Sequence, residues 1–294
     1  MATQLTINAR SAIAATTLSA LSFRVYFQDA QNDIHEAIYD GRWTTSNTAL
    51  FTARRSTPLS VISWDEGKQI RIYCVSANGL LEEWCNSSGG RWVPGYLTNL
   101  KVRVAPNTSI AAVNWDGSNI RVYCQEETSN AIQEFCVGNP WKRGATLPLA
   151  DQGSTIAATS WKDQGGVHLR VYYQAPDLSL KEHCYDGRWY QGGFNPGVAL
   201  KNSAIAATAW VSPGVQIRLY WQDTHGLMTG YKWSGSWQST GSIISAPVGT
   251  HMSAINWNNG SNIRVYYQSY DGSVSEECND GDAWYNGAGA TRTA

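Results

Sequence analysis

The stretch IRVYYQ at residues 263–268 is a near-copy of FRVYFQ at 23–28 and LRVYYQ at 169–174. Each copy places an arginine inside an apolar, strand-like run, although a buried strand has no use for an unpaired guanidinium. Arginines at the same motif position recur every 46 to 50 residues along the chain: Arg24, Arg71, Arg121, Arg170, Arg218 and Arg264. A period of this length indicates a repeated supersecondary unit.

Each repeat contains three apolar segments separated by turn residues. A run of small residues precedes the arginine, as in STIAATSW at 154–161, and a third segment follows it, as in LSLKEHCYDGRW at 178–189. Gly, Asn, Asp and Ser lie between the segments, and little helical periodicity appears. Each repeat therefore predicts three or four short antiparallel strands.

Six such units predict an all-β fold, a six-bladed β-propeller of short antiparallel sheets in one domain spanning 1–294. Blades stacked radially leave only short, protected edges, and the small residues suit first strands that converge at the centre. Two β-sandwiches are the alternative, but an unbroken sixfold period favours a closed ring. The predicted blades span 11–57, 58–107, 108–153, 154–201, 202–250 and 251–294, and residues 1–10 are predicted to close the ring.

Composition narrows the class of ligand. The net charge of −1 argues against a nucleic-acid partner and against a polybasic membrane patch. No apolar run approaches the roughly 20 residues of a membrane helix, so no membrane insertion is predicted. The sequence has fourteen Trp and fifteen Tyr but only five Phe. Because Trp and Tyr combine an apolar ring with a polar group, they favour sites that are partly apolar and partly solvated.

The six cysteines and the start of the chain bear on its compartment. No cysteines form a CxxC pair, so neither zinc nor another metal is predicted, and buried free thiols are favoured over disulfides. The start MATQLTINAR lacks a basic region followed by an apolar one, so no secretory signal is predicted. We expect cytoplasmic synthesis, with the cell surface, the spore surface or non-classical secretion left open as destinations.

Other residues recur at fixed offsets from the arginines. Twelve or thirteen residues later, five repeats carry an acid: Glu36, Glu83, Glu134, Glu182 and Glu276; the repeat of Arg218 has Gly230 there. Seven to nine residues past the acid position lies Trp43, Trp92, Trp141, Trp189, Trp237 or Trp284. Three residues past the acid position, some repeats have a second aromatic residue: Tyr39, Tyr185 or Trp233. A hairpin turn between them should place Arg and Glu on neighbouring strands, roughly opposite one another.

Each element also has a structural explanation. One cross-strand Arg–Glu pair is a common stabilising device, and a periodic Trp can be a core plug. The Tyr two residues after each arginine is assigned mostly to packing. Five copies of the same donor and acceptor instead favour a ligand. A neutral sugar fits, because its hydroxyls donate and accept while its C–H face stacks on indole. No cofactor is predicted.

The unit IRVYYQ…E…W resembles the fungal fucose-specific lectins of the Aleuria aurantia type across essentially the whole chain. The resemblance implies L-fucose held without metal between adjacent blades, with Arg and Glu from one blade and aromatics from the next. By position, it pairs Arg24 and Glu36 with Trp92, Arg71 and Glu83 with Trp141, and Arg121 and Glu134 with Trp189 and Tyr185. It likewise pairs Arg170 and Glu182 with Trp237 and Trp233, and Arg264 and Glu276 with Trp43 and Tyr39.

The resemblance thus implies a multivalent, non-catalytic lectin with about five sites for fucosylated glycans on cell surfaces. The pocket of Arg218 departs from the pattern at Gly230, and the second aromatic is missing at Asn86 and Val137. A homodimer is left open. One alternative is a sialidase-type glycosidase, although no Ser-x-Asp-x-Gly-x-x-Trp box appears and the acids are dispersed one per blade. The other is a protein-interaction propeller, which needs no repeated polar set.

Overall fold

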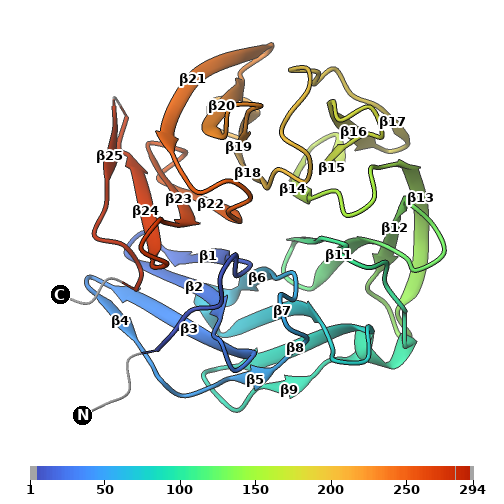
Figure 1. Cartoon of the computed structure of the whole chain (residues 1–294). Coiled ribbons are helices and arrows are strands. Elements are labelled where there is room, and N and C mark those ends of the chain that lie inside the picture. The colour runs from blue at the N-terminus through green and yellow to red at the C-terminus, as the bar shows by residue number, and fades with distance from the viewer. Residues whose placement is uncertain (1–4, 282, 292–294) are drawn as a thin grey trace.

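A computed structural model of the chain describes residues 5–281 and 283–291. Six antiparallel sheets surround a central axis, and the colour in Figure 1 runs once around the ring from the N-terminal to the C-terminal blade. The protein is therefore a six-bladed β-propeller, which confirms the predicted fold class. The described residues contain no helix of the length and apolarity needed to cross a bilayer.

Each blade takes four strands in chain order from the centre outward, and a fifth strand of blade one pairs with its third. Blades one to three comprise β1 (Ala14–Ser19), β2 (Ser22–Gln28), β3 (Asp33–Asp40), β4 (Trp43–Thr45) and β5 (Phe51–Thr52); β6 (Ser60–Trp64), β7 (Gln69–Val75), β8 (Leu81–Ser87) and β9 (Val93–Pro94); and β10 (Ile110–Trp115), β11 (Asn119–Gln125), β12 (Ala131–Cys136) and β13 (Lys142–Leu149). Blades four to six comprise β14 (Ile156–Asp163), β15 (Gly166–Gln174), β16 (Leu180–Asp186) and β17 (Trp189–Gln191); β18 (Ile205–Trp210), β19 (Gln216–Gln222), β20 (Leu227–Trp233) and β21 (Trp237–Ser245); and β22 (Met252–Trp257), β23 (Asn262–Gln268), β24 (Val274–Asn279) and β25 (Trp284–Asn286). Two short 3-10 helices, η1 (Asp65–Gly67) and η2 (Tyr96–Leu100), lie in blade two and after it.

Small side chains allow the six first strands to meet around the axis. Neighbouring first strands contact one another around the whole ring, including β1 against β22. They line a central cavity of about 170 Å³ with residues such as Ala111, Ala157 and Ala206. A larger residue at these positions would push the first strands apart.

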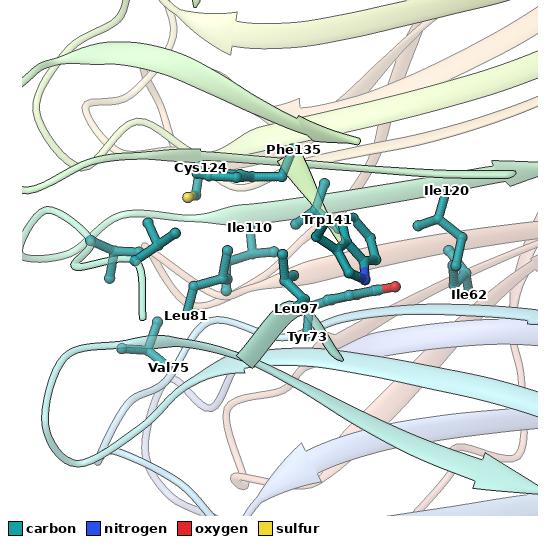
Figure 2. Packing of buried hydrophobic residues seen from close by; sticks show 13 residues of the cluster. Ile62, Tyr73, Val75, Leu81, Leu97, Ile110, Ile120, Cys124, Phe135 and Trp141 are labelled. Carbon is teal, nitrogen blue, oxygen red and sulfur yellow. The ribbon is translucent and has the colours of Figure 1, made fainter. Parts of the chain in front are cut away.

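The hydrophobic core is divided among the interfaces between blades. Each of six clusters draws buried residues from two adjacent blades. Figure 2 shows the cluster between blades two and three, where Tyr73 and Leu81 of one blade pack against Ile120, Phe135 and Trp141 of the next. Burial of such a side chain stabilises the fold by about 1.5–3 kcal/mol, so these interfaces hold neighbouring blades together.

A buried glutamine ends the second strand of five blades and joins its blade to the segment that leads into the next one. The amide of Gln28 donates to the carbonyl of Arg54, and that of Gln125 to the carbonyl of Asp151. Gln268 of blade six donates in the same way to the carbonyl of Asn8 near the N-terminus, at 3.1 Å. The ring closure expected of residues 1–10 stays a prediction; residues 1–4 lie outside the described residues.

Candidate functional site

The predicted arginines and glutamates lie on the second and third strands of their blades, on one face. The register places Arg24 opposite Ile38 and places Glu36 opposite Tyr26, and the other blades repeat this offset. Arg and Glu therefore lie on neighbouring strands and roughly opposite one another, as expected, with an offset of two residues. They are diagonal neighbours, which long side chains can still bridge.

The diagonal arrangement brings guanidinium and carboxylate within reach. The distance from the arginine Nε to the glutamate Oε1 is 3.5 Å for Arg121 and Glu134, 3.8 Å for Arg264 and Glu276, and 4.0 Å for two further pairs, Arg24–Glu36 and Arg170–Glu182. The remaining pair, Arg71 and Glu83, belongs to blade two, where the positive charge of Arg71 acts to lower the pKa of Glu83. Each pair is largely self-neutralising.

The repeated tyrosine has a polar role that its packing position concealed. The hydroxyl of Tyr26 donates to Oε1 of Glu36 at 2.6 Å, and the same bond recurs at 2.9–3.1 Å in the blades of Tyr73, Tyr123, Tyr172 and Tyr266. The tyrosine therefore fixes the glutamate from beneath. Sequence reasoning assigned it to packing, although its constant place opposite the acid could have indicated the bond.

The second glutamate oxygen is held from the rim of the blade. Oε2 of Glu83, Glu134 and Glu182 accepts a backbone N–H, from Leu97 at 3.1 Å, Ala145 at 3.0 Å and Phe194 at 3.3 Å, respectively. A glycine lies against the carboxylate in four blades: a Cβ there would be 2.1–2.2 Å from Oε2 at Gly95, Gly144, Gly192 and Gly287. A larger residue at these positions would therefore have to displace the carboxylate.

Burial shifts the titration of three of these acids. It raises the pKa of Glu36, Glu83 and Glu276, and the hydrogen bonds from tyrosine and the nearby arginine charge offset part of that rise. A further hydrogen-bond donor in the pocket would stabilise the charged form of such a buried carboxyl. The hydroxyl of a ligand is such a donor.

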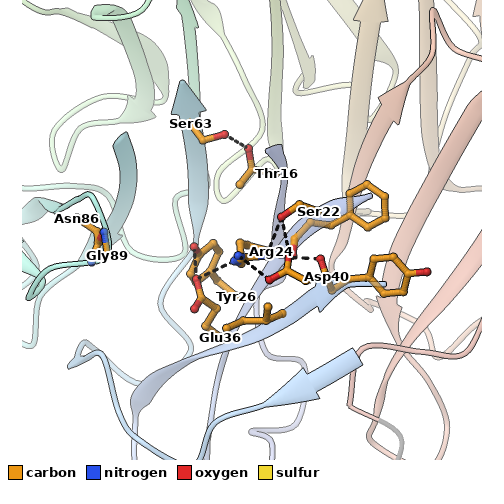
Figure 3. Close-up of polar contacts among 12 residues, drawn as sticks. Thr16, Ser22, Arg24, Tyr26, Glu36, Asp40, Ser63, Asn86 and Gly89 are labelled. Atoms are coloured by element: carbon orange, nitrogen blue, oxygen red, sulfur yellow. Dashed lines mark hydrogen bonds and ion pairs between the residues drawn. The ribbon is translucent and has the colours of Figure 1, made fainter. Parts of the chain in front are cut away.

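An aspartate that the sequence analysis missed clamps three of the arginines. Asp186 accepts two hydrogen bonds from Arg170, at 2.9 and 3.1 Å, and Asp40 and Asp280 hold Arg24 and Arg264 in the same bidentate way. Figure 3 shows this clamp around Arg24, with Ser22 between the two groups. Partial burial alone would raise the pKa of Asp186, but the hydrogen bonds from Arg170, Tyr190 and His168 lower it to about 2. The DG turn before the predicted Trp was the available signal.

A second missed residue is the tryptophan that ends the first strand. The guanidinium carbon of Arg170 lies 4.7 Å from the ring centre of Trp161, and four more arginines stack at 4.6–4.9 Å on Trp64, Trp115, Trp210 and Trp257. Such a cation–π contact stabilises by about 0.5–2 kcal/mol and fixes the plane of the guanidinium. The Trp at the end of each small-residue run was its sequence signal. Blade one has Leu18 at this place.

The predicted tryptophans come from the following blade. The ring of Trp92 meets Tyr26 of blade one edge-on at 6.1 Å, and Trp189, Trp237 and Trp43 meet Tyr123, Tyr172 and Tyr266 at 5.9–6.3 Å. Trp141 packs with Tyr73 in one cluster. Each predicted Arg–Glu pair therefore faces its predicted tryptophan across a blade interface.

Two of these interfaces contain sizeable cavities. One of about 410 Å³ is lined by Arg170, Glu182, Trp233 and Trp237 among others. Another of about 580 Å³ is lined by Arg264 and Glu276 together with Tyr39 and Trp43. Both volumes can hold a monosaccharide with part of a glycan.

The second aromatic differs among the remaining pockets. Tyr185 contacts Trp189 at 5.4 Å and joins the cluster of Tyr123, beside the pocket of Arg121. Asn86, which Figure 3 shows across from Arg24, is instead tied to its own turn, because it donates to Gly90 and accepts from Gly89. Val137 takes the same place beside the pocket of Arg71. These two pockets therefore have one predicted aromatic wall.

All six cysteines are free thiols, as the sequence predicts, and Cys184 and Cys278 line the two cavities. Burial raises the pKa of both to about 12, so neither is a thiolate at neutral pH. Among the described residues, no cluster of His, Cys, Asp or Glu is placed to hold a metal ion.

Known proteins share this sequence and this ring. The family model of the fungal fucose-specific lectins matches residues 7–269 and 197–293. A fucose-specific lectin of Aleuria aurantia is 34% identical over 258 residues, which are 83% of this chain and 66% of that protein. A fucose-specific lectin of Aspergillus fumigatus is 32% identical over 288 residues, which are 91% of this chain and 90% of that protein. The chain thus spans slightly less than two thirds of the first relative and most of the second.

Solved structures show the same architecture. The Aleuria aurantia lectin, described as a six-bladed β-propeller, superimposes with a TM-score of 0.87 at 33% identity and 99% coverage of both chains. A mutant of it in complex with Fucα1-6GlcNAc gives the same TM-score and coverage at 34% identity. A protein from Arthrobotrys oligospora, 27% identical, also gives 0.87 with 95% of this chain and 85% of that one covered. With the family model matching most of its length, this chain belongs to the fungal fucose-specific lectin family.

Proposed function

We propose that this protein is a lectin that binds L-fucose and fucosylated glycans in five pockets between adjacent blades. The observation that carries the proposal is the fivefold recurrence of one arrangement: Arg and Glu held by Tyr on one blade, facing Trp of the next. The names of its relatives, all fucose-specific lectins, support it.

The chemistry of each pocket suits a deoxy sugar. The guanidinium donates and the carboxylate accepts, so vicinal ring hydroxyls can make charge-assisted hydrogen bonds to both. Tyr, Asp and the rim backbone hold these groups in place before the sugar arrives, which lowers the entropic cost of binding. The methyl group of fucose fits against the aromatic wall that Trp233 and Trp237 form beside Arg170.

We propose further that the pockets bind without catalysis. Glycosidases use two carboxylates that attack or protonate across the scissile bond. Here Glu182 and Asp186 share one pocket, but both are engaged by Arg170. The aspartate is also absent from the pockets of Arg71 and Arg121, where Ser87 and Gly138 take its place. Incubation with an aryl α-L-fucoside should release no aryl alcohol, and steady release would contradict this part of the proposal.

Titration calorimetry with methyl α-L-fucoside tests the binding itself. We expect saturable binding at about five sugars per chain, unchanged by EDTA, because no pocket offers a cluster of cation ligands among the described residues. Methyl α-D-glucoside is the matched control, because it lacks the 6-deoxy group and the L configuration. If no heat of binding is measured at millimolar fucoside, the proposal is wrong.

A further inference from the structure

The sixth pocket keeps the repeated backbone but carries a different set of side chains. Arg218 on β19 pairs directly with Lys232 on β20, where four other blades place a cysteine and blade one places Ile38. Directly paired residues of antiparallel strands project from the same face. Both residues are half-buried, so two cationic side chains project from the same face of blade five.

No carboxylate balances these two cations among the described residues. Gly230 takes the place of the glutamate, and Ser234 takes the place of the aspartate and accepts a hydrogen bond from Gln216. In the corresponding pairs of blade four, one arginine faces two carboxylates and the formal charge is −1, with its histidine neutral. In blade five, an arginine and a lysine face none, so the formal charge is +2.

The titration of the arginine agrees with this reversal. Burial lowers the pKa of Arg218, and no carboxylate counters it. In Arg170 and Arg264, burial acts in the same direction, but the hydrogen bonds that they donate to Asp186 and Asp280 outweigh it and their pKa is raised. Arg218 is thus a half-buried cation without an anionic partner among the described residues.

The rest of the pocket remains built for a ring. The guanidinium of Arg218 stacks on Trp210 at 4.6 Å, and Trp284 of blade six meets Tyr220 edge-on at 5.6 Å. A Cβ added to Gly230 would lie 2.7 Å from Oγ1 of Thr240, so a hydroxyl occupies the space beside the missing acid. The site therefore offers donors around an indole wall.

We propose that the pocket of Arg218 binds an acidic sugar, one that carries a carboxylate or a sulfate ester, and does not bind fucose. A neutral sugar needs an acceptor for its hydroxyl protons, and this pocket has lost the acceptor. An oxyanion accepts only, and a guanidinium beside an ammonium matches it with charge-assisted bonds. In the other pockets the glutamate repels the same oxyanion, so one molecule binds acidic sugars in one pocket and neutral fucose in the others. The proposal rests on the proposed function only in taking the ligand to be a saccharide.

The test titrates acidic probes into protein already saturated with methyl α-L-fucoside. The probes are the methyl glycoside of N-acetylneuraminic acid, methyl glucuronide and glucose 6-sulfate, with sodium sulfate as the free ion. We expect at least one acidic sugar to bind at one per chain, more weakly as NaCl is raised, because salt screens the charges. Which probes bind tells carboxylate from sulfate ester.

Variants locate the binding in the sixth pocket. Lys232→Gln and Arg218→Gln should each weaken the acidic sugar by at least about tenfold while the fucoside titration stays as in the parent. Arg170→Gln is the matched control in blade four: it should remove one fucoside site and leave the acidic sugar unaffected.

The outcomes separate the two proposals. If none of the acidic sugars binds, or if Lys232→Gln and Arg218→Gln bind them as well as the parent, the inference is wrong. It is also wrong if sodium sulfate binds as tightly as the sugars, because the pocket would then hold an ion only. A missing fucoside signal in the saturation step would instead contradict the proposed function.

Discussion

Gly192 lies so close to the carboxylate of Glu182 that a single methyl group there should disable one pocket. A Cβ at this position would be 2.2 Å from Oε2, so Gly192→Ala must displace the carboxylate from the place where Tyr172 and Phe194 hold it. We expect fucose in crystals of this variant to be missing beside Arg170. The pocket of Arg264 in the same crystal, with its Gly287 unaltered, is the control. Equal occupancy of both pockets would show that the contact does not matter.

The raised pKa of three glutamates predicts that binding weakens in mild acid. A raised pKa means that Glu36, Glu83 and Glu276 take up protons at a higher pH than an ordinary glutamate, whose value is 4.5. A protonated carboxyl is a poorer acceptor for sugar hydroxyls, so the affinity for methyl α-L-fucoside should fall as the pH drops from 7 toward 4.5.

The same titration has a built-in check on folding. The pKa of Asp280 is held at about 2, below the usual value of 3.8, so its stabilising contribution is present above pH 3.8 and is lost only as the pH falls toward 2. Circular dichroism should therefore show a folded protein throughout the range in which the calorimetric affinity declines. An affinity that is constant from pH 7 to 4.5 would contradict the role given to the glutamates.

At this scale the sequence revealed those residues that recur in every repeat. Arg, Glu and Trp stand at nearly constant offsets, so their meeting could be predicted. Asp186 gave a weaker signal, because the aspartate appears in only three blades and its DG pair is also an ordinary turn sequence. The two-residue offset between Arg170 and Glu182 depends on strand register, which the hairpin turn sets and the spacing alone leaves open.

At the scale of elements, the N-terminal segment is a strap across two blades. Leu5 and Ile7 pack into the cluster between blades six and one, the backbone of Asn8 bonds to Gln28, and Gln268 donates to its carbonyl. Deletion of residues 1–10 leaves these groups unpaired and exposes apolar surface, so we expect the melting temperature to fall by about 5 °C or more.

The strap offers its own control. Asn8→Ala keeps the backbone groups that bond to Gln28 and Gln268 and removes only the side chain, whose buried Nδ2 has no partner. Its melting temperature should stay within a degree or two of the parent in calorimetry. A truncated protein as stable as the full chain would show that closure does not depend on this segment.

The elements themselves were largely predictable, because the period of about 48 residues fixes the number of blades and each apolar run fixes a strand. The outer strands were less so. They range from β9, with two residues, to β21, with nine, since a rim strand faces solvent and little packing constrains its length. The segments after β9 and β17 supply the glycine and backbone N–H that hold Glu83 and Glu182, whereas β13 itself supplies them for Glu134.

For the whole molecule, the five proposed pockets on one ring predict strong attachment to surfaces that display many fucosyl groups. Linked sites gain about 10²–10⁴ in avidity over a single site when several bind at once. The protein should therefore agglutinate fucosylated cells, and free L-fucose should reverse it. A stoichiometry of one fucoside per chain would contradict the multivalent arrangement.

The pockets should also fill in a set order. Those of Arg121, Arg170 and Arg264 have two predicted aromatics, whereas those of Arg24 and Arg71 have one. An aromatic contact contributes about 0.5–1.5 kcal/mol, which is up to about tenfold in affinity. Crystals soaked at low fucose should show the first three occupied, and fucose at Arg218 with an empty Arg170 pocket would overturn the order.

The bond from Gln268 to Asn8 has a consequence for how the ring assembles in time. Its equivalents at Gln28 and Gln125 each span 26 residues, but this one spans 260. By loop-closure entropy, a tenfold longer loop costs about 2 kcal/mol more to form. The same chemical contact is therefore local at some blade junctions and joins the two ends of the described chain at this one. Folding should complete this seam last, and amide exchange should find it opening first.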